Sequence, residues 1–254
     1  ISRMLNSKKT KIVATLGPAT ADPEVIKNMM IAGVNVFRIN FSHADYDDVR
    51  ERIEMIRRIN QENGFHTAIL ADLQGPKLRV GVMEEGTVVT PGDKVTFVTG
   101  EPFVGNKERA YMNYEKFPVD VRPGERILLD DGKLIFEVLS SNGENEVEAV
   151  VIQGGPFSSK KGVNLPNTKV SLPALTEKDV RDALFAITQE VDWFALSFVR
   201  HPDDIQDLKD LIEENAGHKI PIIAKIEKPE ALKNIDKIMA ACDGIMVARG
   251  DLGV

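Results

Sequence analysis

The sequence has 254 residues, of which 43% are hydrophobic and 28% charged, a composition typical of a soluble globular protein with a large core. Its formal net charge of −7 disfavours nucleic acid and anionic membranes as main partners. The single cysteine, Cys242, excludes a disulfide within the chain and fits a reducing compartment. No apolar run approaches the roughly 20 residues of a membrane span, so we expect a cytoplasmic protein.

The first 75 residues alternate between short apolar runs and amphipathic segments. The runs predict strands over residues 11–16, 34–41 and 67–73. The spacing predicts one helix from the N-cap Asp22 to Gly33 and a longer helix over residues 45–63, which stops at Gly64. Alternation of strands with helices indicates a parallel sheet.

This alternation stops between residues 81 and 155, where no convincing helical period is present. Short β-type runs are separated there by turn pairs such as Pro91-Gly92, Pro123-Gly124 and Asn142-Gly143. The runs predict strands over residues 88–89, 94–98, 126–129, 134–139 and 146–152. The segment is therefore expected to form a small all-β barrel, inserted after the third strand.

Helices and strands alternate again after the insertion, beginning with a helix that Thr176 and Asp179 cap. The predicted strands are 193–198, 222–226 and 245–248, and the predicted helices are 202–215 and one from about residue 229. This gives about six strands, whereas a closed (β/α)8 barrel has eight. The expected fold class is therefore α/β, a TIM-type barrel that is incomplete in this chain and is interrupted by the β insertion. The expected domain bounds are 1–75 and 171–254 for the barrel and 76–170 for the insertion.

Charged residues follow the last two predicted strands, at the edge of the sheet where α/β proteins place their active sites. Lys225 and Glu227 alternate onto one side of the fifth strand, and Arg249, Gly250 and Asp251 follow the sixth. One cation and two carboxylates suit a hard metal ion beside an anionic substrate. Charges at strand ends are also common without function, and only their joint occurrence on neighbouring strands favours a site.

Six segments together carry a resemblance to one family. They are TKIVATLGPAT, NVFRINFSH, ADLQGPKLR, SKKGVNLP, IIAKIEKPE and DGIMVARGDLGV. In order and spacing they resemble the signature segments of pyruvate kinase, from Lys11 to the last residue, and the β insertion falls where that family has its lid domain. The resemblance implies a glycolytic phosphotransferase that moves a phosphoryl group from phosphoenolpyruvate to ADP, giving pyruvate and ATP.

The resemblance also implies roles for residues at the strand ends. Glu227 and Asp251 match the ligands of the divalent metal, Mg²⁺ or Mn²⁺. Lys225 and Arg38 match the catalytic cations that hold the transferring phosphoryl group, and Lys225 also matches the residue that stabilises the enolate oxygen. Gly250 and Asp251 match the positions that bind the substrate carboxylate.

The assignment of residues that bind the nucleotide rests on weaker matches to the family. Arg79 and Lys161 match positions that contact the ADP phosphates, although a lysine pair at a linker is also explained as a solvated surface feature. Asn40 and His43 match the nucleotide side, and a capping or packing role explains His43 almost as well. Asp130 lies in a lid hairpin that the resemblance brings over the site.

The sequence departs from the family pattern at the monovalent-cation site. Many members need potassium, which an Asn, a Ser, an Asp and a Thr hold. Asn40, Ser42 and Asp72 match three of them, but Leu73 stands where the Thr would be. Lys77 occupies a position where potassium-requiring members carry Glu, and its ammonium can supply the same single positive charge. We therefore predict potassium-independent activity.

Two alternatives stay open. A magnesium-dependent aldolase or lyase that acts on a pyruvate enolate would use Glu227, Asp251 and a nearby cation, but it has no use for a nucleotide lid. The chain could also be an inactive truncated fragment, since the family's last barrel strands, a substrate-binding threonine and the C-terminal regulatory domain are missing after Val254. For the full-length protein the resemblance implies a homotetramer.

Overall fold

The structure, a computed structural model, describes residues 9–252, which form two compact units. The barrel unit comprises Ile1–Gly75, Ala174–Ile226 and Glu230–Val247, and the β unit comprises Pro76–Pro173, Glu227–Pro229 and Ala248–Val254, as far as these ranges are described. The last two residues of the DGIMVARGDLGV segment lie outside the described part. The domain bounds given above stay a prediction.

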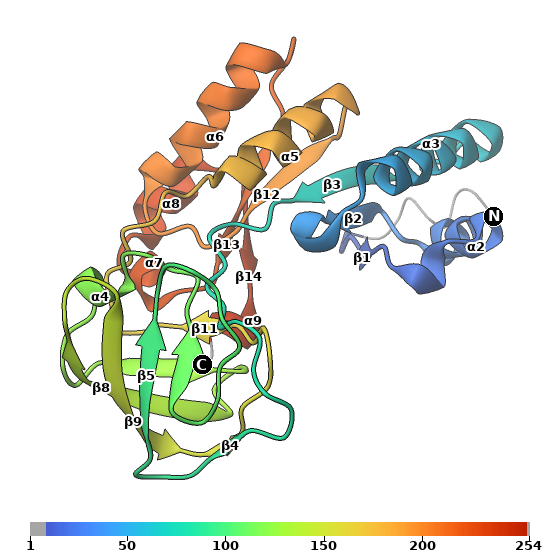
Figure 1. The fold of residues 1–254 in the computed structure, drawn as a ribbon. Coiled ribbons are helices and arrows are strands. Elements are labelled where there is room, and N and C mark those ends of the chain that lie inside the picture. The colour runs from blue at the N-terminus through green and yellow to red at the C-terminus, as the bar shows by residue number, and fades with distance from the viewer. Residues whose placement is uncertain (1–8, 253–254) are drawn as a thin grey trace. The chain divides into compact units, whose positions relative to one another are not determined.

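The barrel unit contains a parallel sheet whose described strands follow one another in the order of the sequence (Figure 1). Its strands are β1 (Val13–Thr15), β2 (Val36–Asn40), β3 (Ala68–Asp72), β12 (Trp193–Leu196), β13 (Ile222–Ile226) and β14 (Gly244–Val247). Asp72, at the end of β3, is in register with Asn40 on one side and with Ala195 on the other. This six-stranded parallel sheet confirms the α/β, incomplete-barrel prediction.

Helices connect these strands along the sheet, and their caps follow the sequence signals (Figure 1). They are α2 (Pro23–Ala32), α3 (Tyr46–Asn63), α5 (Glu177–Thr188), α6 (Pro202–Asn215), α7 (Pro229–Lys233) and α8 (Ile235–Ala241), with short 3₁₀ turns η1 (Pro18–Thr20) and η2 (Phe41–His43). Asp22 accepts a hydrogen bond from the Glu24 amide, and Gly33 ends α2 at a φ of 107°. Thr176 and Asp179 form the predicted capping box.

Several boundaries differ from the sequence predictions, and three of these differences have a clear local cause. Strand β2 ends at Asn40 because Phe41 begins η2, so Ser42 does not continue the strand alternation. Strand β12 ends at Leu196, and Phe198 adopts a φ of 55°, which a strand cannot contain. The helix predicted from about residue 229 is two helices, and Asn234 between them donates a hydrogen bond to the Arg200 carbonyl at 3.0 Å.

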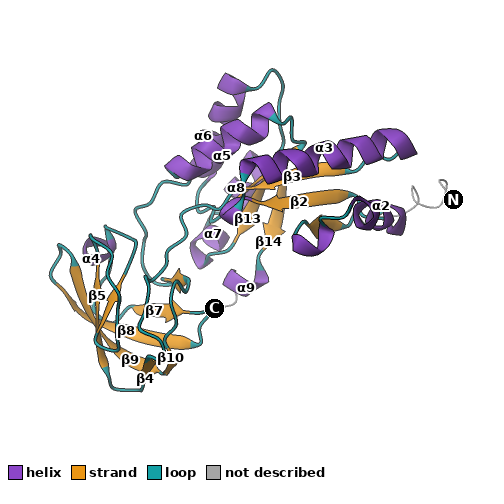
Figure 2. Cartoon of the chain, turned by 45° about the vertical axis from the view of Figure 1, so that its right-hand side comes forward, coloured by secondary structure: helices purple, strands orange, loops and turns teal. Residues whose placement is uncertain are grey.

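The β unit consists mainly of strands and loops (Figure 2). Its strands are β4 (Val88–Val89), β5 (Lys94–Val98), β6 (Arg109–Tyr111), β7 (Arg126–Leu129), β8 (Leu134–Ser141), β9 (Glu146–Gln153), β10 (Gly155–Pro156) and β11 (Val163–Asn164). They pair in the orders β11-β7-β8-β9-β5-β6 and β10-β4, antiparallel except for β5 with β6. This mixed sheet agrees with the predicted inserted β domain.

Except for β4, the short elements of the β unit were not predicted. Strands β6, β10 and β11 have two or three residues, and β10 is a Gly-Pro pair, which strands normally disfavour. The two helical turns α4 (Phe117–Asp120) and α9 (Arg249–Leu252) have four residues each. A single turn is too short to produce a detectable period of 3.6 residues.

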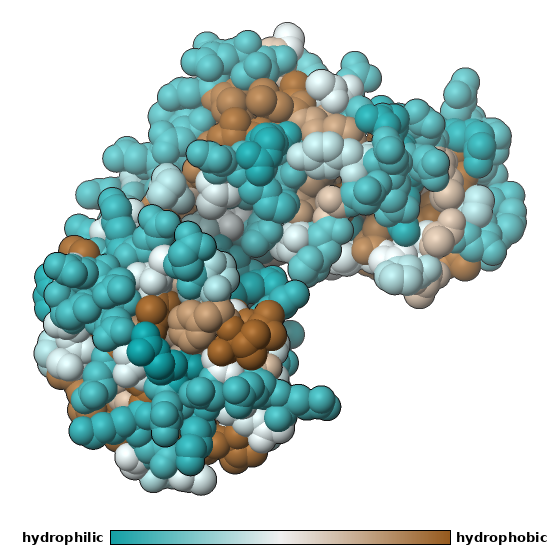
Figure 3. Space-filling model, in the orientation of Figure 1, coloured by the Kyte–Doolittle hydropathy of each residue, from teal (hydrophilic) through white to brown (hydrophobic). Residues whose placement is uncertain are grey.

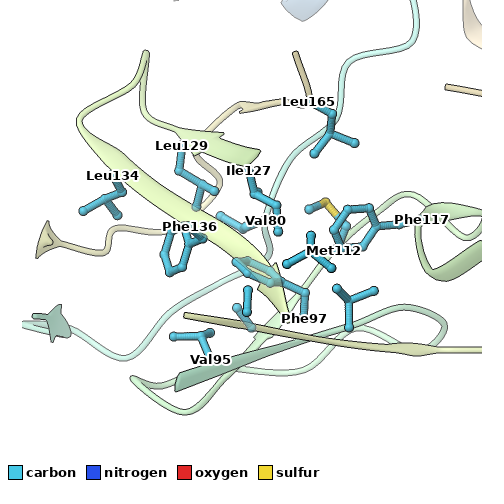
Figure 4. Close-up of a cluster of buried hydrophobic side chains, with 14 of the residues drawn as sticks. Val80, Val95, Phe97, Met112, Phe117, Ile127, Leu129, Leu134, Phe136 and Leu165 are labelled. Carbon is cyan, nitrogen blue, oxygen red and sulfur yellow. The ribbon is translucent and has the colours of Figure 1, made fainter. Parts of the chain in front are cut away.

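Aliphatic side chains and aromatic rings together fill the interior of the β unit (Figure 4). The rings of Phe97 and Phe136, on β5 and β8, meet edge to face with centroids 5.2 Å apart. Phe117 of α4 packs on Phe97 in the same manner at 6.2 Å, and Phe157 lies 5.8 Å from Phe136. All four side chains are fully buried, so this unit has a hydrophobic core of its own.

The barrel unit buries its apolar residues between helices and sheet, whereas its edge strands stay partly exposed. Helix α3 buries the predicted face of Val49, Ile53, Ile56 and Ile59. Val13 on β1 and Val247 on β14 are 47% and 56% exposed. On the face drawn in Figure 3 the surface is mostly hydrophilic, with apolar side chains gathered in separate small areas. None of the described helices combines the length and the apolarity that crossing a membrane requires.

We expect Phe136→Ala to lower the free energy of unfolding of the β unit by about 3–5 kcal/mol, because it deletes a buried ring and leaves a cavity beside the rings of Phe97 and Phe157. Denaturant unfolding followed by circular dichroism measures this change. Leu139→Ala is the matched control on the same strand, since Leu139 is 37% exposed. Equal losses in the two variants would contradict the proposed core.

Candidate active site

The buried carboxylate of Asp72 is the centre of a charged cluster at the carboxyl end of the sheet. Asp72 is 1% exposed and ends β3. Its Oδ2 accepts from Arg38 Nε at 2.6 Å and lies 2.5 Å from Arg38 Nη2. Arg38 Nη1 also donates to Thr15 Oγ1 at 2.9 Å. Residues on β1, β2 and β3 therefore fix the plane of one guanidinium group.

A second cation reaches the same carboxylate from β13. Lys225 Nζ lies 3.3 Å from both oxygens of Asp72 and donates to Ser197 Oγ at 2.9 Å. The Lys225 side chain is 12% exposed. One buried carboxylate thus holds an arginine and a lysine, a net positive arrangement that suits an anionic ligand with several oxygens.

The η2 turn presents the polar residues that follow β2. Asn40 caps it by accepting from the Ser42 amide at 3.1 Å, and His43 is exposed. Lys178 holds the turn from α5 by donating to the Phe41 carbonyl at 2.6 Å. Asn40 is thus explained locally as a cap, and its carboxamide oxygen is already in use. Leu73, at the predicted cation position, is fully buried.

Helices α3 and α5 are joined next to this turn. Tyr46 donates to Asp182 Oδ1 at 2.6 Å, and Lys178 donates to the other oxygen of the same carboxyl. The Tyr46 ring stacks on Phe185 with centroids 4.2 Å apart. Burial, together with the hydrogen bond to Asp182, raises the pKa of Tyr46 to about 12. Tyr46 therefore remains a protonated donor at neutral pH.

The β unit carries the basic residues assigned to the nucleotide side. Lys161 Nζ lies 3.4 Å from Asp130 Oδ1, and Lys133 Nζ lies 3.2 Å from Asp130 Oδ2. Burial opposes ionisation of Asp130, but the two lysines outweigh it and lower the pKa of that carboxyl below its ordinary value. Asp130 is thus an ionised anchor for the two lysines, at a φ of 50°.

Arg79 lies in the same unit with an unsatisfied donor. Its backbone amide donates to Asn113 Oδ1 at 2.8 Å, and it forms an isolated bridge with Gly162, next to Lys161. Within the described part of the chain its Nε is buried and has no hydrogen-bond partner. A buried guanidinium N–H without a partner is costly unless a ligand supplies an acceptor.

The two predicted metal ligands also fall within the β unit. Glu227 is 3% exposed, whereas Asp251 is exposed on α9, and its carbonyl lies 3.5 Å from Asn164 Nδ2. A Cβ at Gly250 would meet no atom within 4 Å, so packing does not require glycine there. Among the described residues no group of three or more His, Cys, Asp or Glu is arranged to hold a metal. Two carboxylates nevertheless fit Mg²⁺, which takes water and substrate oxygens as its other ligands.

Comparison with known proteins gives the family. The family described as "Pyruvate kinase, barrel domain" matches residues 7–254. The chain belongs to the pyruvate kinase family. It is 44% identical to a pyruvate kinase of Corynebacterium efficiens and 40% identical to one of Clostridium perfringens, each over 97% of this chain and 52% of the relative. It is 46% identical to pyruvate kinase 2 of Synechocystis over 97% of this chain and 42% of that protein. The chain spans about half the length of the curated relatives it matches.

The residues predicted from the pyruvate kinase resemblance separate into two groups. Arg38, Asp72 and Lys225 come together in the barrel unit, where Asn40, Ser42, His43 and Leu73 also lie. Lys77, Arg79, Lys161, Glu227, Gly250 and Asp251 belong to the β unit. The functional assignment of each residue stays a prediction.

Two polar residues of this cluster were missed. Thr15 and Ser197 contact Arg38 and Lys225 directly, although neither was selected from the sequence. Thr15 lies inside the TKIVATLGPAT segment, and Ser197 follows directly on the strand β12. Strand-end position, the signal that was used for Lys225, also identifies both of them.

We expect Asp72→Ala to lower the free energy of unfolding of the barrel unit by about 3 kcal/mol, because it removes the carboxylate that two largely buried cations share. Added inorganic phosphate should restore more stability to this variant than to the unaltered protein. Thermal unfolding with and without phosphate measures both effects. Asp47→Ala is the control, since that side chain is 87% exposed and its pair with Arg50 should contribute less than about 1 kcal/mol. An Asp72→Ala variant with an unchanged free energy of unfolding would contradict the role of Asp72.

Proposed function

We propose that this chain carries the catalytic cations of an enzyme that transfers the phosphoryl group of phosphoenolpyruvate to ADP. The observation that carries the proposal is the Arg38–Asp72–Lys225 cluster at the carboxyl ends of β2, β3 and β13. Membership of the pyruvate kinase family supports the reaction class. Phosphoryl transfer needs positioning and charge neutralisation, which two fixed cations supply.

Arg38 is suited to hold the phosphoryl group in line. A guanidinium has five N–H donors, and Asp72 and Thr15 occupy three of them by the contacts among the described residues. The other two remain for phosphate oxygens. Because Asp72 fixes the guanidinium plane, these donors are oriented before the substrate arrives and cost little reorganisation.

Lys225 is suited to stabilise the negative charge that develops on the enol oxygen during the transfer. In the proposed step the bond between phosphorus and the enol oxygen of phosphoenolpyruvate breaks, and a bond between phosphorus and a terminal oxygen of ADP forms. The electron pair of the broken bond stays on the enol oxygen, and the resulting enolate takes a proton at carbon to give pyruvate. An ammonium beside the bridging oxygen stabilises the negative charge that develops there.

Glu227 and Asp251 would hold the divalent ion, magnesium or manganese, with substrate oxygens completing its shell. When bound, the ion supplies Lewis-acid stabilisation of the substrate carboxylate and enolate oxygens. Gly250 leaves open space for the backbone approach of that carboxylate. On the nucleotide side, the unsatisfied Nε of Arg79 and the ammonium of Lys161 favour binding of the ADP phosphates.

Turnover of phosphoenolpyruvate to pyruvate, measured in the natural gene product with Mg²⁺ and with and without ADP, tests this function. We expect pyruvate to form only when ADP is present, since the phosphoryl group needs its acceptor. Arg38→Lys should lower kcat/KM by roughly 100-fold, because a point charge replaces a planar fork. Pyruvate formation from another substrate, without ADP, would favour the aldolase or lyase alternative. Inactivity under all conditions would favour the alternative that the chain is an inactive fragment.

Potassium independence is a separate prediction that concerns Lys77. We expect full activity in Tris buffer without potassium or sodium, because the Lys77 ammonium replaces the monovalent ion. Lys77→Glu should lose at least about tenfold in kcat in that buffer and regain activity with added potassium. Lys116→Glu, a charge reversal elsewhere in the β unit, is the control. Dependence of the unaltered protein on potassium would contradict the role of Lys77.

A further inference from the structure

Ser197 lies one residue beyond β12 and is 2% exposed. Its hydroxyl connects three strand ends. It donates to the Leu73 carbonyl beyond β3 at 2.6 Å, accepts from Lys225 Nζ of β13 at 2.9 Å, and lies 3.4 Å from Asp72 Oδ1. None of the roles assigned above to the cluster includes this residue.

The chemistry of its neighbours fixes the direction of each hydrogen bond. Both the Leu73 carbonyl and Asp72 Oδ1 can only accept, and Ser197 gives its single proton to the nearer of the two, the Leu73 carbonyl at 2.6 Å rather than Asp72 at 3.4 Å. A lysine ammonium can only donate, so Ser197 must offer Lys225 a lone pair. The hydroxyl rotor is therefore set by the backbone of residue 73, and its acceptor direction points at the Lys225 ammonium.

The backbone around Ser197 is fixed as well. Phe198 adopts a φ of 55°, an uncommon conformation for a bulky residue that surrounding structure must maintain. Gly75 lies against this turn, where an added Cβ would be 2.8 Å from Ser197 Cβ and 3.0 Å from Phe198 Cδ2. The Gly75 amide donates to Asp179 Oδ1 at 3.0 Å, inside the capping box of α5. The serine is thus anchored from β3 and from α5.

We propose that Ser197 is a positioning residue that sets the direction of the Lys225 ammonium for phosphoryl transfer. This inference rests on the function proposed above for Lys225. Both oxygens of Asp72 lie 3.3 Å from the Lys225 ammonium. These contacts fix the distance between the ammonium and the carboxylate, but they do not fix the direction in which the N–H groups point. The Ser197 lone pair selects one direction for the ammonium, the one from which it acts on the enol oxygen of the substrate.

The main test is steady-state kinetics of Ser197→Ala in the natural gene product. We expect kcat to fall roughly 10- to 100-fold, the range for loss of a hydrogen bond to a charged group, while KM for ADP changes less than about twofold. Ser197→Thr retains the hydroxyl and should recover most of kcat. Ser141→Ala is the matched control, because it removes an equally short hydroxyl-to-carbonyl bond, 2.6 Å to Pro118, in the β unit and should leave kcat unchanged.

A double-mutant cycle distinguishes two roles of Ser197, positioning of the Lys225 ammonium and a purely structural link between β3 and β12. In a Lys225→Met background, Ser197→Ala should change the residual kcat by less than about twofold, since the group it positions is gone. A loss of the same factor in both backgrounds would overturn the inference, and so would unchanged kcat in the single Ser197→Ala variant. Absence of turnover in the unaltered protein would instead overturn the proposed function.

Discussion

The barrel unit depends on one buried carboxylate. Asp72 is almost inaccessible to solvent, and a carboxylate in such a place must be paired or else neutralised. It is paired with Arg38 and Lys225, which come from strands on either side of β3 and β12. The charge that organises the site is therefore also a requirement of the fold. Removing Asp72 takes away the carboxylate that compensates the desolvation of both cations.

Each of the two units has a hydrophobic core of its own. In the barrel unit, aliphatic side chains of helices such as α3 pack on a parallel sheet, and buried carboxylates lie at the end of β3 and in helices α5 and α6. In the β unit, aliphatic side chains pack together with edge-to-face aromatic rings between the strands. Because each unit buries its own apolar surface, the loops that carry Arg79, Lys161 and Asp130 can vary without disturbing the sheet that carries Arg38.

Much of this could be predicted from the sequence. Caps at Asp22, Gly33 and Thr176 are local interactions, so the helices that they bound were assigned almost to the residue. The strand-end cations were found because parallel strands bring their carboxyl ends to one edge. Non-local constraints were not visible. The turn at Phe198 depends on packing against Gly75, and the break at Asn234 depends on a hydrogen bond to Arg200. Ser197 is one of many serines until the position of Lys225 is known.

The order of strands in the barrel unit has a consequence for synthesis. Each strand pairs with the strand that precedes it in the unit, so the sheet can extend by one strand at a time as the chain leaves the ribosome. The longest interruption lies between β3, which ends at residue 72, and β12, which begins at residue 193, a separation of 193 − 72 = 121 residues. At a synthesis rate of about 5–20 residues per second, the edge of β3 that pairs with β12 stays unpaired for ~6–24 s. Strands β4 to β11 of the β unit, from Val88 to Asn164, are all synthesised within that interval, while the edge of β3 that later pairs with β12 is still open.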